Sequence, residues 1–156
     1  MLRQNHRWTT TLSVAVALTL ATWVGASGMA DLTRELKDAR DDQRATQGMR
    51  MLDFQRLYEK GEVLVVDVRD RASYEQGRIA GAVHVGLDEV AARAVEVRRR
   101  ASSRMVVTYC SCPSEASSLR VAQALGEHGV PAQALIGGYH GWVDAGGRTA
   151  RGPATR

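Results

Sequence analysis

The distribution of apolar and charged residues divides the chain into three parts. Residues 8–30 contain no charged side chain, and residues 31–50 are rich in charge and poor in apolar residues. From residue 51 onward, short apolar runs alternate with stretches in which apolar residues recur every three or four positions. Only this last part has the pattern of a folded domain, since both periodicities place apolar side chains on one face of a strand or helix.

Within the third part, four apolar runs predict β-strands at residues 63–68, 82–85, 104–109 and 132–136. The run 63–68, VLVVDV, is continuous and β-branched, which is typical of a strand buried on both faces. Helices are expected between the runs, at residues 51–60, 71–77, 87–101, 113–128 and, after a turn, within 137–147. Strands that alternate with helices predict a small α/β domain with a mostly parallel central sheet flanked by helices.

Three of these helices carry more detailed expectations. Helix 51–60 should place Leu52, Leu57 and Tyr58 on one face, and helix 87–101 should begin its apolar face at Leu87. Helix 113–128 should start with Pro113 at its first position, because proline is favoured there.

No element is expected in residues 148–156, which are predicted to form a flexible tail.

The first thirty residues have the features of an export segment. Arg3 and Arg7 precede the uncharged residues 8–30 and Asp31 follows them, an arrangement that places the N-terminus inside and the domain outside. The segment suits a signal peptide, an uncleaved signal anchor that spans the cytoplasmic membrane, or, less naturally, a buried core helix. A periplasmic or membrane-anchored domain is therefore expected, with residues 1–30 as the signal peptide or anchor and residues 31–50 as a charged spacer.

Length and charge limit the remaining possibilities. A chain of 156 residues has room for one domain. Of its 21 basic residues two lie in the first thirty, so the rest of the chain carries 19 basic against 17 acidic side chains. That excess is too small to indicate nucleic-acid binding. The basic run Arg98-Arg99-Arg100 ends a predicted helix, where cations favour the negative end of the helix dipole.

The stretch YCSCPSE, residues 109–115, contains the only two cysteines of the chain, Cys110 and Cys112. Cys110 directly follows a predicted parallel strand and precedes a predicted helix. Sites in such sheets form beyond the carboxyl ends of the strands. Backbone amides at the helix start should lower the pKa of the Cys110 thiol and stabilise an anionic sulfur. Sulfane sulfur transfer, in which a thiolate carries the sulfur as a persulfide, suits this geometry.

Three segments of this chain resemble the rhodanese family of single-domain sulfurtransferases. They are VLVVDVRDRASYEQGRIAGAVHV, MVVTYCSCPSEASSLRVAQALGEHGV and LIGGYHGW, and the resemblance covers residues 51–147. It implies the rhodanese-like fold, a persulfide formed on Cys110, and structural support from Asp67 and Arg69 at the end of a strand. It implies no cofactor and no metal, a small sulfur donor, and a thiol or cyanide-like acceptor, with a protein partner as a further option. The matching persulfide cradle consists of Ser111, Cys112, Pro113, Ser114, Glu115 and Ala116.

The chain departs from the family pattern at Glu115, where many rhodaneses carry arginine. Residues 111–119 contain no lysine or arginine at all. An acid at the entry of the loop should repel doubly negative thiosulfate, so a less charged donor such as a persulfide is expected. On this reasoning, replacing Glu115 with arginine should improve thiosulfate turnover.

Other interpretations of the same residues stay open at the sequence level. Cys112 is either a small residue that leads into the helix or a second thiol that resolves the persulfide. A metal site that uses the cysteines with His84, His128 or His140 is only weakly indicated, because zinc needs about four ligands from paired motifs.

Two further alternatives concern the whole domain. A phosphatase on this scaffold would need an arginine six residues after Cys110, and that position is Ala116. The main rival to a sulfurtransferase is a non-catalytic rhodanese-like binding module tethered at the membrane.

Tyr139 and Trp142 are interpreted as packing residues.

Overall fold

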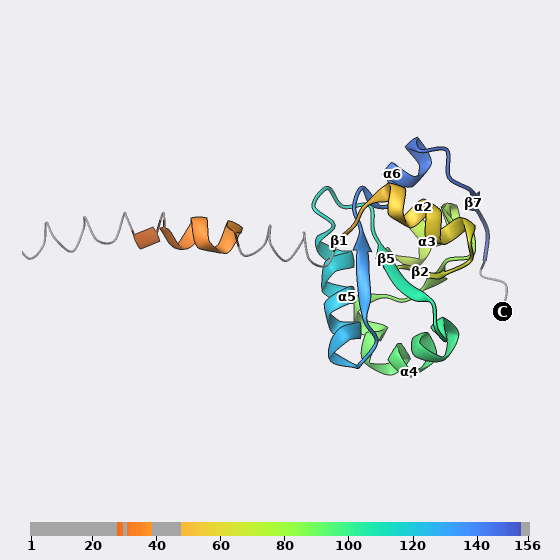
Figure 1. Ribbon diagram of the computed structural model, residues 1–156, viewed down its shortest axis with the longest axis horizontal. Helices are drawn as coiled ribbons and strands as arrows, with labels where there is room; N and C mark the ends of the chain where they lie inside the picture. Colours follow the sequence, from red (N-terminus) through yellow and green to blue (C-terminus); the bar gives the residue numbers. More distant parts are fainter. Residues whose placement is uncertain (1–27, 30, 39–47, 154–156) are drawn as a thin grey trace, which may run out of the picture. The chain divides into compact units, whose positions relative to one another are not determined.

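The computed structural model describes residues 28–29, 31–38 and 48–153 (Figure 1). The chain separates into two compact units, residues 1–42 and 43–156, and each is described by itself. In the first unit, residues 28–29 and 31–38 are helical and exposed. No helix among the described residues is long and apolar enough to cross a membrane. Most of the expected export segment, residues 1–27 and 30, lies outside the described residues, so that expectation stays a prediction.

A five-stranded parallel sheet forms the centre of the second unit. Its strand order is β1-β6-β5-β2-β4, and every neighbouring pair is parallel. β2 and β5 pair over five residues in register, from Val63 opposite Met105 to Asp67 opposite Tyr109. The predicted α/β class with a mostly parallel sheet is confirmed. The strands are β1 (Gly48–Met49), β2 (Val63–Asp67), β4 (Val83–His84), β5 (Met105–Tyr109) and β6 (Ala132–Leu135).

Helices cover both faces of this sheet, which explains why β2 is buried along its whole length (Figure 1). On one face α4 and α5 pack over a cluster of mainly aliphatic side chains that includes Val66, Val97 and Leu125. On the other face the cluster is aromatic and includes Phe54, Tyr74 and Trp142 from α2, α3 and α6. The helices are α2 (Met51–Glu59), α3 (Arg71–Gln76), α4 (Val90–Ala101), α5 (Ala116–Glu127) and α6 (Gly138–Asp144), with a 3-10 turn at Leu87–Glu89.

Two short pairings differ from the sequence-based expectations. β1 lies within the predicted spacer and pairs with β6, so the sheet begins before residue 51. β7 (Thr149–Ala150) lies within the predicted flexible tail and pairs antiparallel with β3 (Arg78–Ile79). The Arg78 side chain also donates to the Gly152 carbonyl at 2.6 Å. Backbone pairing of two residues leaves too little periodicity in the sequence to be recognised.

The helices lie where they were predicted, but some side chains expected on a buried face are exposed and one helix starts later than expected. α2 buries Phe54 completely, whereas Leu52 is 69% exposed and Leu87 is 43% exposed. α5 begins at Ala116, three residues later than predicted, because Glu115 adopts the left-handed conformation and interrupts the helix. The basic run Arg98–Arg100 does occupy the last turn of α4, as predicted.

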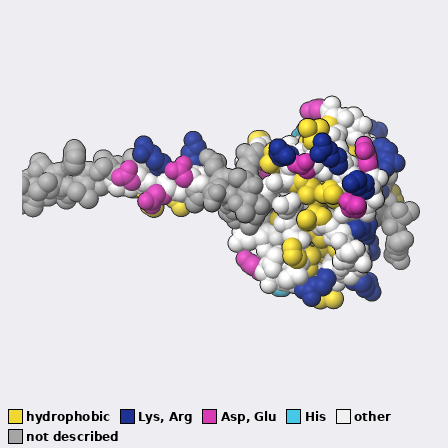
Figure 2. Space-filling model, viewed as in Figure 1, with side chains coloured by type: hydrophobic (Ala, Val, Ile, Leu, Met, Phe, Trp, Pro, Cys, Tyr) yellow, Lys and Arg dark blue, Asp and Glu magenta, His cyan; other side chains and the backbone are white. Residues whose placement is uncertain are grey.

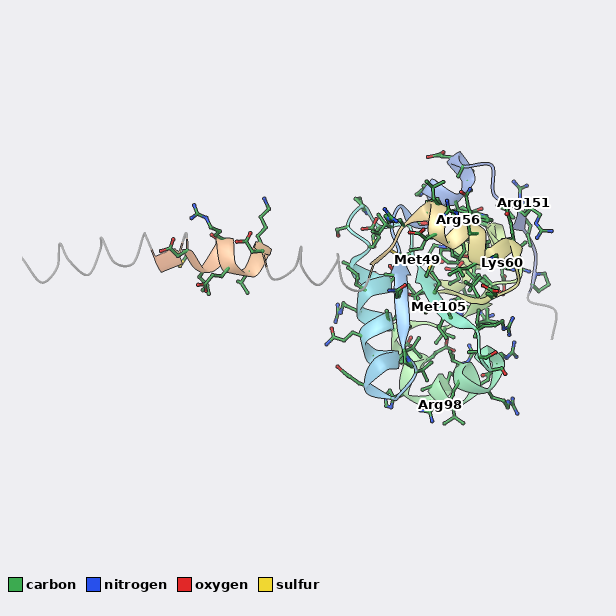
Figure 3. All side chains as sticks on the ribbon, viewed as in Figure 1. Met49, Arg56, Lys60, Arg98, Met105 and Arg151 are labelled. Atoms are coloured by element: carbon green, nitrogen blue, oxygen red, sulfur yellow. The ribbon has the colours of Figure 1, made fainter. Side chains whose placement is uncertain are left out.

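The surface of the second unit carries apolar side chains between basic ones. Figure 2 shows hydrophobic atoms across the centre of the face turned to the viewer, and Met105, labelled in Figure 3, is 40% exposed there. The basic residues labelled in Figure 3 come from separate elements: Arg56 belongs to α2, Arg98 to α4, and Arg151 follows β7.

The aromatic core beneath α2 makes a quantitative prediction. Phe54 contacts Trp142 edge to face with ring centroids 5.2 Å apart, and none of its surface is exposed. Phe54→Ala should lower the free energy of unfolding by about 3–5 kcal/mol through lost burial and the cavity left behind. Leu52→Ala on the same helix is the matched control and should change stability by less than about 0.5 kcal/mol. Urea unfolding measures both, and equal losses would contradict the observed helix face.

Candidate active site at Cys110

Cys110 directly follows β5, the strand that pairs with both β2 and β6, and only 3% of the residue is exposed. Its carbonyl accepts a hydrogen bond from the Tyr139 N–H at 2.9 Å, at the start of α6. Gly138, at a φ of +51°, lies so close that a Cβ atom would stand 2.2 Å from the Cys110 carbonyl oxygen. Only glycine fits there, and the Cys110 backbone is therefore held firmly between β5 and α6.

Hydrogen-bond donors of the following loop and helix surround the Cys110 sulfur. The Cys112 N–H donates to Sγ at 3.4 Å. The Ser118 hydroxyl, from the first turn of α5, has two acceptors in reach for its single proton, Cys110 Sγ at 3.7 Å and the Glu115 carbonyl oxygen at 2.9 Å. Ser118 is fully buried and was not among the predicted site residues. Its helical spacing from Val121, Ala122 and Leu125, which lie on the buried face of α5, was the signal that could have identified it.

The predicted lowering of the Cys110 pKa is wrong for this arrangement. Burial raises the pKa of the Cys110 thiol, and its hydrogen bond to Cys112 raises it further. The hydrogen bonds that Cys112 and Ser118 donate to the sulfur act in the opposite direction but do not outweigh burial.

Cys112 is the more acidic of the two thiols. Its residue is partly buried, which by itself raises the pKa of the thiol. Hydrogen bonds from the Cys110 thiol and from Ser117 more than compensate, and the pKa of Cys112 lies below its usual value near 9. Because α5 starts at Ala116, Cys112 is not the residue that leads into the helix.

Glu115 is buried rather than exposed at the mouth of the loop. Only 4% of the residue is exposed, and its Oε1 accepts a hydrogen bond from the Gly137 N–H at 3.0 Å. Its backbone is left-handed, with a φ of +50°, which is unusual for a residue other than glycine. The side chain thereby ties the cysteine loop to the turn before α6. This geometry opposes the expectation that arginine at this position would serve thiosulfate binding.

The other predicted cradle residues form the outer side of the loop. Ser111, Pro113, Ser114 and Ala116 are all exposed. The N–H of Glu115 closes the loop by donating to the Cys112 carbonyl at 3.2 Å. The loop is therefore short, compact and open to solvent on one side.

Asp67 and Arg69 form a buried ion pair next to the site. The Arg69 Nε and Nη2 atoms donate to the Asp67 carboxylate at 2.9 and 2.6 Å, and Asp67 has no exposed surface. The Tyr109 hydroxyl donates to the same carboxylate at 2.5 Å, and burial together with this anion raises the pKa of Tyr109. The Arg69 guanidinium lies 4.2 Å from the centre of the Tyr139 ring. The pair thus supports both neighbours of Cys110, Tyr109 in sequence and Tyr139 in space.

The histidines considered for a metal site lie in different environments. His84 is largely buried and its Nε2 lies 2.6 Å from the Arg69 carbonyl oxygen, whereas His128 and His140 are exposed. Within the part of the chain that the structure describes, no three His, Cys, Asp or Glu side chains form a group that could hold a metal ion.

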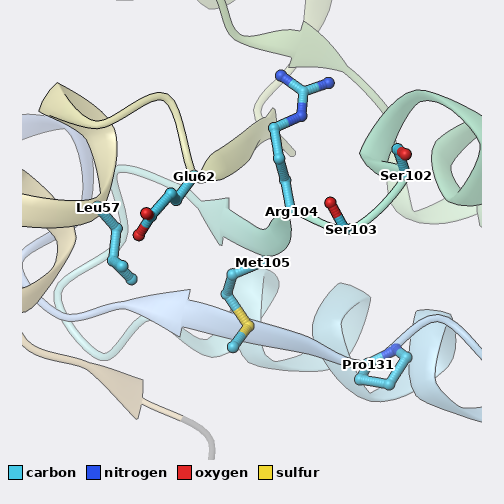
Figure 4. A pocket seen from close by; sticks show the side chains of 7 residues that line it. All are labelled: Leu57, Glu62, Ser102, Ser103, Arg104, Met105 and Pro131. Carbon is cyan, nitrogen blue, oxygen red and sulfur yellow. The ribbon is translucent and has the colours of Figure 1, made fainter.

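A surface hollow of about 590 Å³ lies elsewhere on the domain (Figure 4). It is lined by Glu62 just before β2, by Met105 at the start of β5 and by Pro131 just before β6. These are the amino ends of the strands, whereas Cys110 lies beyond the carboxyl end of β5. The hollow is therefore separate from the sulfur site.

The role of Glu115 leads to a prediction about stability. Glu115→Gln keeps an oxygen that accepts the Gly137 N–H and should cost less than about 1 kcal/mol, whereas Glu115→Ala removes that acceptor together with a buried side chain and should cost about 1–3 kcal/mol. Glu115→Arg introduces a buried cation and should cost about 3–5 kcal/mol. Urea unfolding of the three variants measures this order. An arginine variant as stable as the wild type would show that the side chain can leave the interior.

Comparisons with known proteins find similar sequences and folds. A thiosulfate sulfurtransferase, GlpE, of Coxiella burnetii (strain RSA 331 / Henzerling II) is 36% identical over 88 residues, which are 55% of this chain and 77% of the relative. The crystal structure of a thiosulfate sulfurtransferase from Pseudomonas aeruginosa superimposes with a TM-score of 0.62 and 25% identity, covering 74% of this chain and 22% of that one.

A second solved structure shares the fold alone. It is a protein of unknown function from Rhodopseudomonas palustris, described as a possible tyrosine phosphatase, with a TM-score of 0.61, 22% identity, and coverage of 73% of this chain and 92% of that one. The model of the rhodanese-like domain family matches residues 51–145. With that match over the greater part of its length, this chain belongs to the family of rhodanese-like domains.

Proposed function

We propose that this chain is a sulfurtransferase that carries sulfane sulfur as a persulfide on Cys110. The observation that carries the proposal is the position of Cys110 beyond the carboxyl end of β5, with the Cys112 N–H and the Ser118 hydroxyl directed at its sulfur. Sulfurtransferases among the relatives support it at the level of reaction class.

The reaction consists of two displacements at sulfur. In the first, the Cys110 thiolate attacks the sulfane sulfur of a donor, a bond forms between the two sulfurs, and the rest of the donor leaves with the electron pair. In the second, a thiolate or cyanide attacks the outer sulfur and Cys110 leaves as a thiolate. The donors around Sγ stabilise the anion formed at each stage, as preorganised dipoles do elsewhere.

We further propose a donor less charged than thiosulfate. Residues 111–119 carry no lysine or arginine, and Arg69 is engaged with Asp67. The acid of the loop, Glu115, is buried and held by Gly137. A doubly negative donor would meet neutral amides and hydroxyls but no cation of the loop. A small-molecule persulfide needs less charge compensation.

The place of action is also a proposal. The two arginines before the uncharged residues 8–30, and Asp31 after them, support export with the domain outside the cytoplasmic membrane, either released or anchored. A non-catalytic module at the membrane is the alternative function. The intact, hydrogen-bonded Cys110 favours the enzyme.

Cyanide as acceptor provides the first test, because thiocyanate reports sulfur transfer directly. The wild type should form thiocyanate, and its kcat/KM with a small-molecule persulfide should exceed that with thiosulfate by about tenfold or more, since one missing charge-assisted contact amounts to about 1–3 kcal/mol. Cys110→Ser should abolish the reaction.

Cys112→Ser is the matched control for that variant and should retain measurable thiocyanate formation. A folded wild type that forms no thiocyanate from either donor would support the binding module instead. Thiosulfate turnover equal to persulfide turnover would refute the proposed donor class but leave the persulfide on Cys110 intact.

Export is tested by reporter fusions after Arg156. A reporter that is active only outside the cytoplasm, such as alkaline phosphatase, should be active in the fusion, and one active only in the cytoplasm should be silent. Substituting both Arg3 and Arg7 with glutamate should reduce export, because basic residues before the apolar segment set its orientation. Cytoplasmic reporter activity in the unmutated fusion would contradict the proposed location.

A further inference from the structure

The persulfide site on Cys110 has restricted access. Cys110 is 3% exposed, and its carbonyl is held by the Tyr139 N–H with Gly138 in close contact. The backbone of Cys110 cannot move outward without breaking that hydrogen bond, and rotation of its side chain would take the sulfur away from the Cys112 N–H that donates to it. An acceptor must therefore reach the sulfur where it lies. A two-atom ion such as cyanide can do so more readily than a peptide or protein thiol.

Cys112 lies on the same turn and is less enclosed. Its N–H donates to the Cys110 sulfur at 3.4 Å. The residue is only partly buried and is flanked by the exposed residues Ser111 and Pro113. Cys112 therefore lies between the buried sulfur and the solvent.

The acidities of the two thiols favour release of sulfur from Cys112 to an external acceptor. Burial raises the pKa of Cys110, whereas hydrogen bonds from Cys110 and Ser117 hold the pKa of Cys112 below its usual value. In exchange reactions at sulfur, the thiol of lower pKa is the better leaving group. A persulfide on Cys112 would accordingly pass its outer sulfur to an acceptor more readily than a persulfide on Cys110. In the transfer between the two cysteines the less acidic Cys110 is the poorer leaving group, so the persulfide stays mainly on Cys110 until an acceptor removes sulfur from Cys112.

We propose that Cys112 is a second sulfur carrier, which takes the outer sulfur from Cys110 and presents it to thiol acceptors too bulky to reach Cys110. The inference rests on the proposed function. In the step, a bond forms between Cys112 Sγ and the outer sulfur, the bond from that sulfur to Cys110 Sγ breaks, and Cys110 leaves as a thiolate. Charge and oxidation state are conserved, so no oxidant or reductant is needed.

The competing reaction of the same two residues is attack of Cys112 on the inner sulfur. That step would expel hydrosulfide and close a disulfide across a single intervening residue, Ser111. Such a small ring departs from relaxed disulfide geometry and stores strain. Attack at the outer sulfur forms no disulfide ring. The two routes give different products and are separated by the experiment.

Kinetics with acceptors of two sizes test the relay. The wild type, Cys112→Ser and Cys112→Ala are supplied with a small-molecule persulfide, and kcat/KM is measured for cyanide and for the tripeptide thiol glutathione. The ratio of glutathione to cyanide values should fall by tenfold or more in both variants. An unchanged ratio would overturn the relay, while an absence of thiocyanate from the wild type would instead refute the proposed function.

Mapping the sulfur by mass spectrometry completes the test. After loading without acceptor and blocking with iodoacetamide at successive times, the wild type should carry the additional sulfur first on Cys110 and later on Cys112 in part of the molecules. Sulfur that appears on Cys112 before Cys110 would refute the proposed order of transfer. Release of sulfide with formation of a disulfide between the two cysteines would show that attack occurs at the inner sulfur and would overturn the relay.

Discussion

The hydrogen bond from the Tyr139 N–H to the Cys110 carbonyl is the contact on which the site depends. It joins the end of the central strand β5 to the start of α6 and is possible only because residue 138 is glycine. A second bond, from the Gly137 N–H to Glu115, ties the far end of the cysteine loop to the same turn. The consecutive residues Gly137, Gly138 and Tyr139 thus hold the cysteine loop at both of its ends. The position of the sulfur is therefore set by hydrogen bonds and close packing alone.

The buried carboxylate of Asp67 helps to hold the residues around Cys110 in place. Burying a charge is costly unless it is paired and hydrogen-bonded, and Asp67 receives the Arg69 guanidinium and the Tyr109 hydroxyl. Arg69 in turn lies over the ring of Tyr139. The position of the residue that clamps Cys110 is therefore set by an ion pair formed at the end of the neighbouring strand β2.

The sequence predicted the parts of the fold that depend on periodic burial. Val63–Val66 of this strand has to be apolar because helices cover both faces, and that run was recognised. Two-residue strands such as Thr149–Ala150 depend on backbone bonds to distant segments and leave no periodic pattern. At the site, the sequence pointed to Cys110 but not to the burial of Glu115 or Ser118. The buried Glu115 has a left-handed backbone, a conformation that glutamate rarely adopts and that no local pattern announces, whereas Ser118 shares its helix face with Val121 and Leu125 and was overlooked.

The same missing information explains why the predicted lowering of the Cys110 pKa was wrong. A helix start favours a thiolate when the sulfur is near the surface, and the prediction assumed that exposure. Here the sulfur lies 3.4 Å from the Cys112 N–H but inside a nearly closed environment, where desolvation outweighs the hydrogen bonds. Enclosure keeps water and stray oxidants from a carried sulfur, yet it also limits which acceptors reach it. Cys112 is a more acidic and less buried thiol on the same turn. Protection of the sulfur and access for acceptors can therefore be divided between two residues, with Cys110 holding the sulfur and Cys112 releasing it.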